Sequence, residues 1–170
     1  MILRCTQRLL KGSGLEIEAD PPQPEAVLGE WYAHTVSLPF PGRGLVMYVS
    51  ANTLLTVLVP GRAVRTTLPV FRQRMPLLLR RLELPGDWVD AQARAAAEVL
   101  VARTKDRRVI GSMNEIANLA WAQAEVHSSF ESLDLDRLES WLARVPHSML
   151  RYRYPRDVAA ELARAGSPAA

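Results

Sequence analysis

The residues of this chain that are best suited to chemistry lie close together in RTKDRRVIGSMN, at positions 103–114. An arginine guanidinium can donate two parallel hydrogen bonds to one phosphate or carboxylate, and a lysine adds a point charge. Ser112 followed by Glu115 fits a capping box, so this spacing predicts the start of a helix. Because a helix start has free N–H groups and the positive end of the helix dipole, the segment could bind an anion. The candidate residues are Arg103, Lys105, Arg107, Arg108, Ser112 and Asn114.

A purely structural role would explain the same residues. Positions 106–107 would then form a turn, positions 109–110 would belong to the core, and Ser112 would only cap the helix. Glu115 would also repel an anion bound at the helix start. Both interpretations are open at this point.

A second basic segment, RYRYP at positions 151–155, alternates arginine with tyrosine. Arg151 and Arg153 could contact phosphates while the tyrosines stack on exposed bases, an arrangement typical of proteins that bind single-stranded nucleic acid. The leading interpretation is therefore a binding or regulatory module for an anionic partner such as nucleic acid, engaged through residues 103–108 and 151–156. The alternative is that the tyrosines pack on the following helix.

The chain has a net charge of +3, but its charges are unevenly distributed. Residues 68–112 contain nine Arg or Lys and five acids, whereas residues 113–145 contain six acids and two arginines. A basic face on one copy could meet an acidic face on another, and the four tryptophans could contribute to such an interface. A protein partner or a homo-oligomer is thus the second interpretation. The arginines before residue 100 that could join a nucleic-acid surface are Arg72, Arg74, Arg80 and Arg81.

No complete catalytic or metal-binding motif is present in the sequence. The phosphate-binding patterns G-x-x-x-x-G-K-[ST] and G-x-G-x-x-G do not occur. His34, His127 and His147 lack the spacing and the neighbouring cysteines of common zinc sites, and Cys5 alternates with apolar residues as in a buried strand. We therefore assign no catalytic residue, no metal and no cofactor, and the sequence favours binding over catalysis. The remaining ligand-binding or enzymatic alternative is a pocket near Arg107, Arg108, Ser112 and Asn114.

The elements that must position these residues can be read from apolar patterns. Strands are predicted at 2–6, 28–38, 45–50, 54–59 and 99–104, with a short return to strand at 108–110. The three strands from residue 28 to 59 suggest an antiparallel meander whose middle strand is buried on both faces. The expected fold class is α+β, with a mainly antiparallel sheet of three to five strands covered by four or five helices.

Helices are predicted from 3.6-residue spacing and from caps. One begins at residue 68 and contains Pro76, which should kink or split it. Others are expected over 89–98, from Ser112, from a cap at Asp134, and from Pro155 to near Gly166.

The length of 170 residues and the hydrophobic content of 48% predict one domain over 1–166, with a flexible proline-rich loop at 19–27 and a frayed tail at 167–170. The single cysteine fits a reducing compartment, so we expect a cytoplasmic protein. No apolar segment approaches the roughly 20 residues that span a bilayer. Arg4 and Arg8 interrupt the apolar residues at the start, so neither a membrane span nor a secretory signal is expected.

Four blocks of the sequence resemble those of an uncharacterised bacterial domain family. They are MILRCTQRLL, LGEWYAH, ANTLLTVLVP and ARTKDRRVIGSMNE, which start at residues 1, 28, 51 and 102. Members of this family pair an RCT strand with an LG-x-WYA strand and have an arginine-containing turn into GSMN. His34 stands where such sequences have an asparagine, and the loop before residue 28 is longer. The resemblance implies a shared fold and carries no activity, because none is established for the family.

Overall fold

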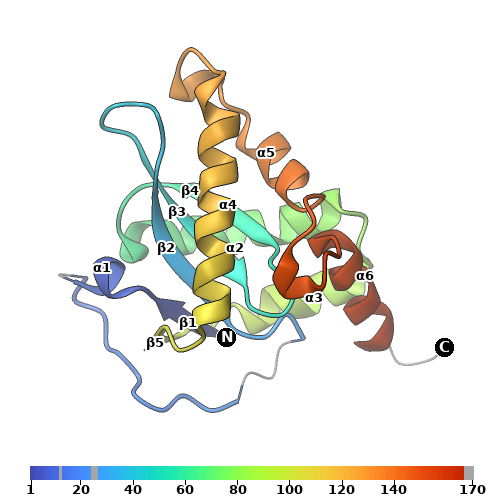
Figure 1. The fold of residues 1–170 in the computed structure, drawn as a ribbon. Coiled ribbons are helices and arrows are strands. Elements are labelled where there is room, and N and C mark those ends of the chain that lie inside the picture. Colours follow the sequence, from blue (N-terminus) through green and yellow to red (C-terminus); the bar gives the residue numbers. More distant parts are fainter. Residues whose placement is uncertain (12, 24–26, 167–170) are drawn as a thin grey trace.

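Five strands form one sheet in the computed structural model, which describes residues 1–11, 13–23 and 27–166 (Figure 1). The strands are β1 (Ile2–Cys5), β2 (Trp31–Ser37), β3 (Gly44–Ser50), β4 (Thr56–Pro60) and β5 (Leu100–Arg103). Their order in the sheet is β4-β3-β2-β1-β5. The consecutive strands β2, β3 and β4 pair antiparallel, which confirms the predicted meander. β1 pairs in parallel with β2 and β5, so the sheet is mixed rather than purely antiparallel.

Each parallel pair joins strands that are far apart in the sequence, because parallel neighbours require a connection of a dozen or more residues. The chain between β1 and β2 contains the short helix α1 (Gln7–Leu10) and a proline-rich segment. The chain between β4 and β5 contains α2 (Val64–Arg81) and α3 (Gly86–Ala95). The parallel pairing of β1 with β5 places the carboxyl ends of these two strands next to each other, with Cys5 opposite Arg103.

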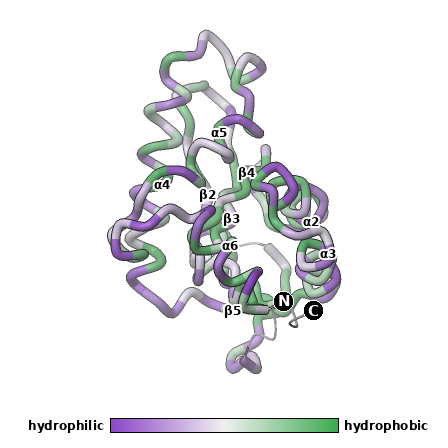
Figure 2. The backbone as a smooth tube through the Cα atoms, turned by 90° about the vertical axis from the view of Figure 1, so that its right-hand side faces the viewer, coloured by the Kyte–Doolittle hydropathy of each residue, from purple (hydrophilic) through white to green (hydrophobic). Residues whose placement is uncertain are grey.

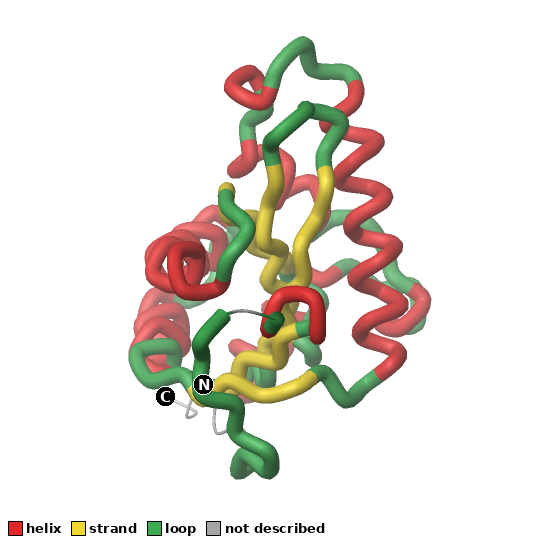
Figure 3. Tube along the Cα trace, turned by 90° about the vertical axis from the view of Figure 1, so that its left-hand side faces the viewer, coloured by secondary structure: helices red, strands yellow, loops and turns green. Residues whose placement is uncertain are grey.

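Helices cover both faces of the sheet (Figures 2 and 3). On one face lie α4 (Arg107–Glu125) and α5 (Leu135–Leu142), and on the other lie α2, α3 and α6 (Pro155–Gly166). The middle strand β3 shows why both covers are needed. Leu45, Met47 and Val49 are buried with residues of α4, whereas Val46 and Tyr48 are buried with residues of α2. Since successive side chains point to opposite faces of a strand, this continuous apolar sequence must be covered on both sides.

Most of the predicted helices are present, with one clear correction. The helix α2 runs unbroken through Pro69 and Pro76, so Pro76 does not split it, whereas the predicted alternative of a kink stays a prediction. Its buried stripe, which includes Phe71 and Met75, packs against the sheet and compensates for the hydrogen bond that a proline removes. Asp134 caps α5 and Pro155 begins α6, as predicted. The described chain has six α-helices, of which α1 is only four residues long and α2 to α6 are the five that cover the sheet, and two short 3₁₀ helices, η1 (Phe130–Ser132) and η2 (Ser148–Leu150).

The proline-rich segment contains neither helix nor strand in its described residues 13–23 and 27–30. Positions 24–26 of the predicted loop and the tail at 167–170 lie outside the described residues. The N–H of Glu18 donates to the Val101 carbonyl at 2.7 Å, so part of this segment lies along the outer edge of β5. None of the helices that the structure describes is both long enough and apolar enough to cross a membrane.

Candidate anion-binding surface

The helix α4 begins six residues earlier than the capping-box pattern predicts, with Asp106 as its N-cap in place of Ser112. It starts at Arg107, and the Asp106 carboxylate caps it by accepting a hydrogen bond from the Arg108 N–H at 2.8 Å. The predicted helix start at Ser112 and the predicted strand at 108–110 are therefore wrong. An aspartate is an equally good N-cap, and starting at Arg107 allows Val109 to join the buried stripe of the helix. Hydrogen bonds from Arg108 lower the pKa of Asp106, whose carboxylate already occupies the helix start.

The earlier start separates Ser112 from Asn114. Ser112 is buried in α4, and its hydroxyl donates to the Met149 sulfur at 3.6 Å, whereas Asn114 is exposed to solvent. Residues two apart on a helix do not face the same side. Arg108 pairs with Asp106 at 2.9 Å, and Arg107 is exposed. The structure therefore does not bring Ser112 and Asn114 together around one anion, and an anion-binding role of these two residues stays a prediction.

Arg103 and Lys105 instead line a groove at the carboxyl ends of β1 and β5, which we call the strand-end groove. It consists of two adjoining hollows of about 580 and 510 Å³ that share Ile17, Arg103 and Thr104. Ligands in α/β proteins commonly bind beyond the carboxyl ends of parallel strands. The other residues of the first hollow are Cys5, Gln7, Leu10 and Lys11, and those of the second are Arg4, Glu18, Ala19, Asp20, Pro21, Gln23 and Lys105.

A buried ion pair holds one side of this groove. The Arg4 guanidinium donates two hydrogen bonds of 2.6 Å to the Glu30 carboxylate, and the two side chains are 7% and 9% exposed. Arg4 also donates to the Arg103 carbonyl at 2.9 Å, and Lys105 donates to Glu30 at 3.0 Å. Burial opposes the ionisation of Glu30, but the hydrogen bonds from Arg4 and Lys105 outweigh it and lower its pKa. The charged pair thus fixes the backbone of β5 and the position of the Lys105 ammonium.

The first hollow has an excess of positive charge. Within the described part of the chain, the side chains of Arg103 and Lys11 make no hydrogen bond or ion pair, and no acid lines this hollow. The second hollow is mixed, because Glu18 and Asp20 lie on its rim. An anion is therefore favoured in the first hollow, next to Arg103.

The nearby Cys5 is a core residue, as predicted. Its side chain is buried, and burial raises the pKa of the thiol to about 12, so the thiol stays protonated at neutral pH. His34 shares a hydrogen bond of 3.2 Å with Thr6, and burial together with the charge of Arg8 lowers its pKa. Among the described residues, no group of three or more His, Cys, Asp or Glu side chains could hold a metal ion.

The second basic segment lies beside α4. The contact between Ser112 and Met149 holds η2 against this helix, and His147 Nδ1 lies 3.9 Å from the Glu115 carboxylate. Arg153 forms an ion pair with Glu161, whereas Arg151 is exposed and its side chain has no partner among the described residues. Tyr152 is 76% exposed, so it does not pack on the last helix.

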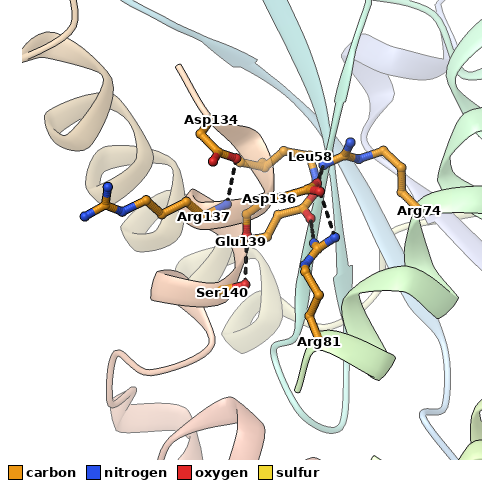
Figure 4. Close-up of polar contacts among 8 residues, drawn as sticks. All are labelled: Leu58, Arg74, Arg81, Asp134, Asp136, Arg137, Glu139 and Ser140. Atoms are coloured by element: carbon orange, nitrogen blue, oxygen red, sulfur yellow. Dashed lines mark hydrogen bonds and ion pairs between the residues drawn. The ribbon is translucent and has the colours of Figure 1, made fainter. Parts of the chain in front are cut away.

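Two of the arginines proposed for the basic surface are used inside the molecule (Figure 4). Arg74 and Arg81 of α2 bind Asp136 and Glu139 of α5, and we call these four residues the α2–α5 charge cluster. The Glu139 side chain is 0% exposed and also accepts the Leu58 N–H of β4 at 2.8 Å. The opposite charges of the two sequence regions therefore meet within one chain at this point. Arg80 likewise pairs with Asp90, at 2.6 Å.

Sequence reasoning missed the partners of the groove. Arg4 offered a usable signal, because a charged residue between buried apolar residues of a strand needs a buried partner. Nothing local marks Glu30 as that partner, since the two residues meet only through the parallel pairing of β1 with β2. Lys11 and Thr104 both line the groove because β1, which precedes Lys11, pairs in parallel with β5, which precedes Thr104.

Residues 2–158 match the sequence model of the family DUF6933, described as a domain of unknown function, so the chain belongs to this family. This match confirms the resemblance to an uncharacterised domain family. The chain has no match among curated proteins or among solved structures.

Proposed function

We propose that this protein is a binding module for a phosphate-bearing partner, which it engages in the strand-end groove. The observation that supports this most directly is that Arg103 lines both hollows and that its guanidinium has no partner among the described residues. Lys11 lines the first hollow with Arg103, and Lys105, which donates to Glu30, lines the second. Cations along the two adjoining hollows fit a partner that carries phosphate groups.

Nucleic acid is the partner class to test first. Outside the groove, η2 packs on α4 and is followed by Arg151, whose side chain has no partner among the described residues, and by the exposed Tyr152. A polyanion can contact separated cations at the same time, and an exposed tyrosine can stack on a base. Arg107, Arg108 and Arg153 belong to this proposal as additional contacts.

The test is binding of fluorescent single-stranded and double-stranded oligonucleotides across a salt series. The variant Arg103→Ala/Lys105→Ala should bind at least about tenfold more weakly, and the slope of log Kd against log salt should fall by about 1 to 2, the loss expected for two phosphate contacts. Arg151→Ala should have a smaller effect, because one contact is removed. The matched control is Arg94→Ala, an exposed arginine of α3 that also lacks a partner among the described residues.

No binding to either oligonucleotide at low salt would exclude nucleic acid. Equal losses in Arg94→Ala and in the double variant would mean that the binding is diffuse and does not depend on the groove.

A small phosphate-bearing ligand is a second candidate, favoured by the size of the first hollow. Its volume of about 580 Å³ lies within the range of small-molecule sites, and Leu10 and Ile17 give it an apolar wall. Calorimetric titration with adenosine monophosphate and with inorganic phosphate tests this candidate. Binding of either compound that is lost in Arg103→Ala, without binding of oligonucleotides, would favour it over nucleic acid.

A further inference from the structure

No described residue of the chain covers the outer face of α4. This long helix lies on the near side of the molecule in Figure 1, with no other element in front of it. Residues three and four apart on a helix share one side, and one such series points away from the buried stripe of Val109, Met113, Ile116 and Ala120. Its exposed members are Arg107, Gly111, Asn114, Asn118, Trp121 and Glu125.

The composition of this face fits the centre of a protein interface. It carries no charge between Arg107 at one end and Glu125 at the other, and it exposes a tryptophan, Trp121, by 40%. Interface centres are depleted in charged residues and enriched in tryptophan. Within the described residues, none of these side chains forms a hydrogen bond or ion pair in the monomer.

Neither the backbone conformation nor the packing around position 111 requires a glycine there. Glycine is a poor helix former, yet this one lies inside α4 without a positive φ. A Cβ added at this position would meet nothing within 4 Å. The absence of a side chain is therefore not required by packing inside the monomer, whereas it would allow another molecule to approach the helix closely.

The outer face of α4 is complementary to the same face of a second copy whose α4 runs in the opposite direction. Arg107 and Glu125 lie nine residues before and after Ile116, Gly111 and Trp121 lie five residues before and after it, and Asn114 and Asn118 lie two. A twofold axis that passes the helix near residue 116 would therefore bring each member of a pair opposite the other member in a second copy.

We infer that the protein forms a twofold symmetric dimer in which the outer faces of two α4 helices pack antiparallel. Arg107 of each copy forms an ion pair with the second copy's Glu125 at both ends of the interface. Trp121 of each copy fills the space above the second copy's Gly111, and Asn114 meets Asn118 near the axis. Each contact joins groups of opposite charge, complementary size or matching hydrogen-bonding capacity.

This interface does not rest on the proposed binding function and shares only Arg107, one of its additional contacts, with it. It uses a different surface from the strand-end groove, because Arg103 and Lys105 precede α4 and line the groove. The facing helices would be about 27 Å long at 1.5 Å per residue. A contact of this length is small beside a standard interface of about 800 Å² per partner, so the dimer should dissociate in the micromolar range.

Sedimentation velocity from about 1 to 500 µM tests the inference. The wild-type protein should shift from its monomer mass of 18.9 kDa toward twice that mass as its concentration rises. Arg107→Glu and Glu125→Arg should each remain monomeric, because like charges then face each other at both ends. An equimolar mixture of these two variants should dimerise, because every facing pair is again opposite in charge. Arg94→Glu is the control and should dimerise like the wild type.

Gly111→Ala tests dimerisation separately from folding stability. It should raise the thermal unfolding midpoint by about 2–4 °C, since alanine is the better helix former, and yet weaken dimerisation at least about tenfold. Trp121→Ala should weaken dimerisation by a similar factor. A wild-type protein that stays monomeric at 500 µM would overturn the inference and leave this face to a different partner. Dimerisation that survives both single charge reversals, or that mixing fails to restore, would overturn it as well.

Discussion

The α2–α5 charge cluster and the strand-end groove use the same residue types for opposite purposes. In the cluster, two guanidinium groups and two carboxylates pair with one another, and the central Glu139 side chain is fully buried. In the groove, Glu30 satisfies Arg4 and Lys105, whereas Arg103 has no partner among the described residues. The pairing of the charges within the chain, rather than their number, therefore determines which basic residues are available to bind another molecule.

The largest effect should come from breaking the buried cluster. Glu139→Ala should lower the free energy of unfolding by about 3–5 kcal/mol, because Arg74 and Arg81 lose the buried one of their two shared partners and the Leu58 N–H loses its acceptor. Burial raises the pKa of Glu139, and the hydrogen bonds from Leu58 and the two arginines oppose this rise. Urea unfolding followed by circular dichroism measures the change.

A surface pair provides the control for this prediction. Arg80 and Asp90 are 52% and 53% exposed, so Arg80→Ala should change the unfolding free energy by less than about 1 kcal/mol. If Glu139→Ala were as mild as Arg80→Ala, the buried cluster would contribute no more than a solvated ion pair.

The buried pair of the groove should give a smaller, pH-dependent effect. Glu30→Gln removes the charge that accepts hydrogen bonds from Arg4 and Lys105, so the unfolding free energy at pH 7 should fall by about 1.5–3 kcal/mol. The lowered pKa of Glu30 means that its contribution is present above the ordinary glutamate value of 4.5 and is lost as the pH falls through the folded value. The difference between the wild type and the variant should therefore shrink below about pH 4.5.

Unfolding titrations at pH 7 and pH 4 measure this difference. A destabilisation that stays equal at both pH values would show that the ionised form of Glu30 is not what stabilises the groove.

The cap of α4 should have an effect of about 1 kcal/mol. Asp106→Ala removes the acceptor of the Arg108 N–H, and loss of an N-cap typically costs this amount. The corresponding change at the position predicted from the sequence is Ser112→Ala, which removes only a buried contact with Met149. Chemical denaturation of both variants should place the larger loss at Asp106, and the reverse order would contradict a helix start at Arg107.

Much of the fold could be predicted from the sequence because its signals are local. The apolar and β-branched segments identify β2, β3 and β4, and the turns between them predict the antiparallel meander. The start of α4 was placed wrongly because two capping patterns, at Asp106 and at Ser112, lie within one stretch, and local spacing does not decide between them. The additional burial of Val109 decides, and that is a property of the packed helix.

The candidate site was less predictable because it depends on pairing between distant segments. Arg74 and Arg103 are both arginines in a basic part of the sequence, but only Arg74 meets acids of a later helix. Glu30 and Arg4 come together through the parallel pairing of β1 with β2. No spacing rule predicts such contacts, so sequence alone could not separate structural charges from available ones.

The smallest effect on stability is expected at Arg103. Its substitution compares the strand-end groove directly with the α2–α5 charge cluster. Arg103→Ala should change the unfolding free energy by no more than about 0.5 kcal/mol, because its exposed side chain has no partner among the described residues. The same substitution in the buried cluster, Arg74→Ala, should cost more than about 2 kcal/mol, because it leaves Glu139 and Asp136 with one guanidinium instead of two. Parallel urea titrations of the two variants compare one chemical change in two environments. If Arg103→Ala proved as costly as Arg74→Ala, Arg103 would be structural, and only Lys11 would be left as a groove cation without a partner among the described residues. A neutral Arg103→Ala that still lost ligand binding would identify a residue retained for a partner rather than for the fold.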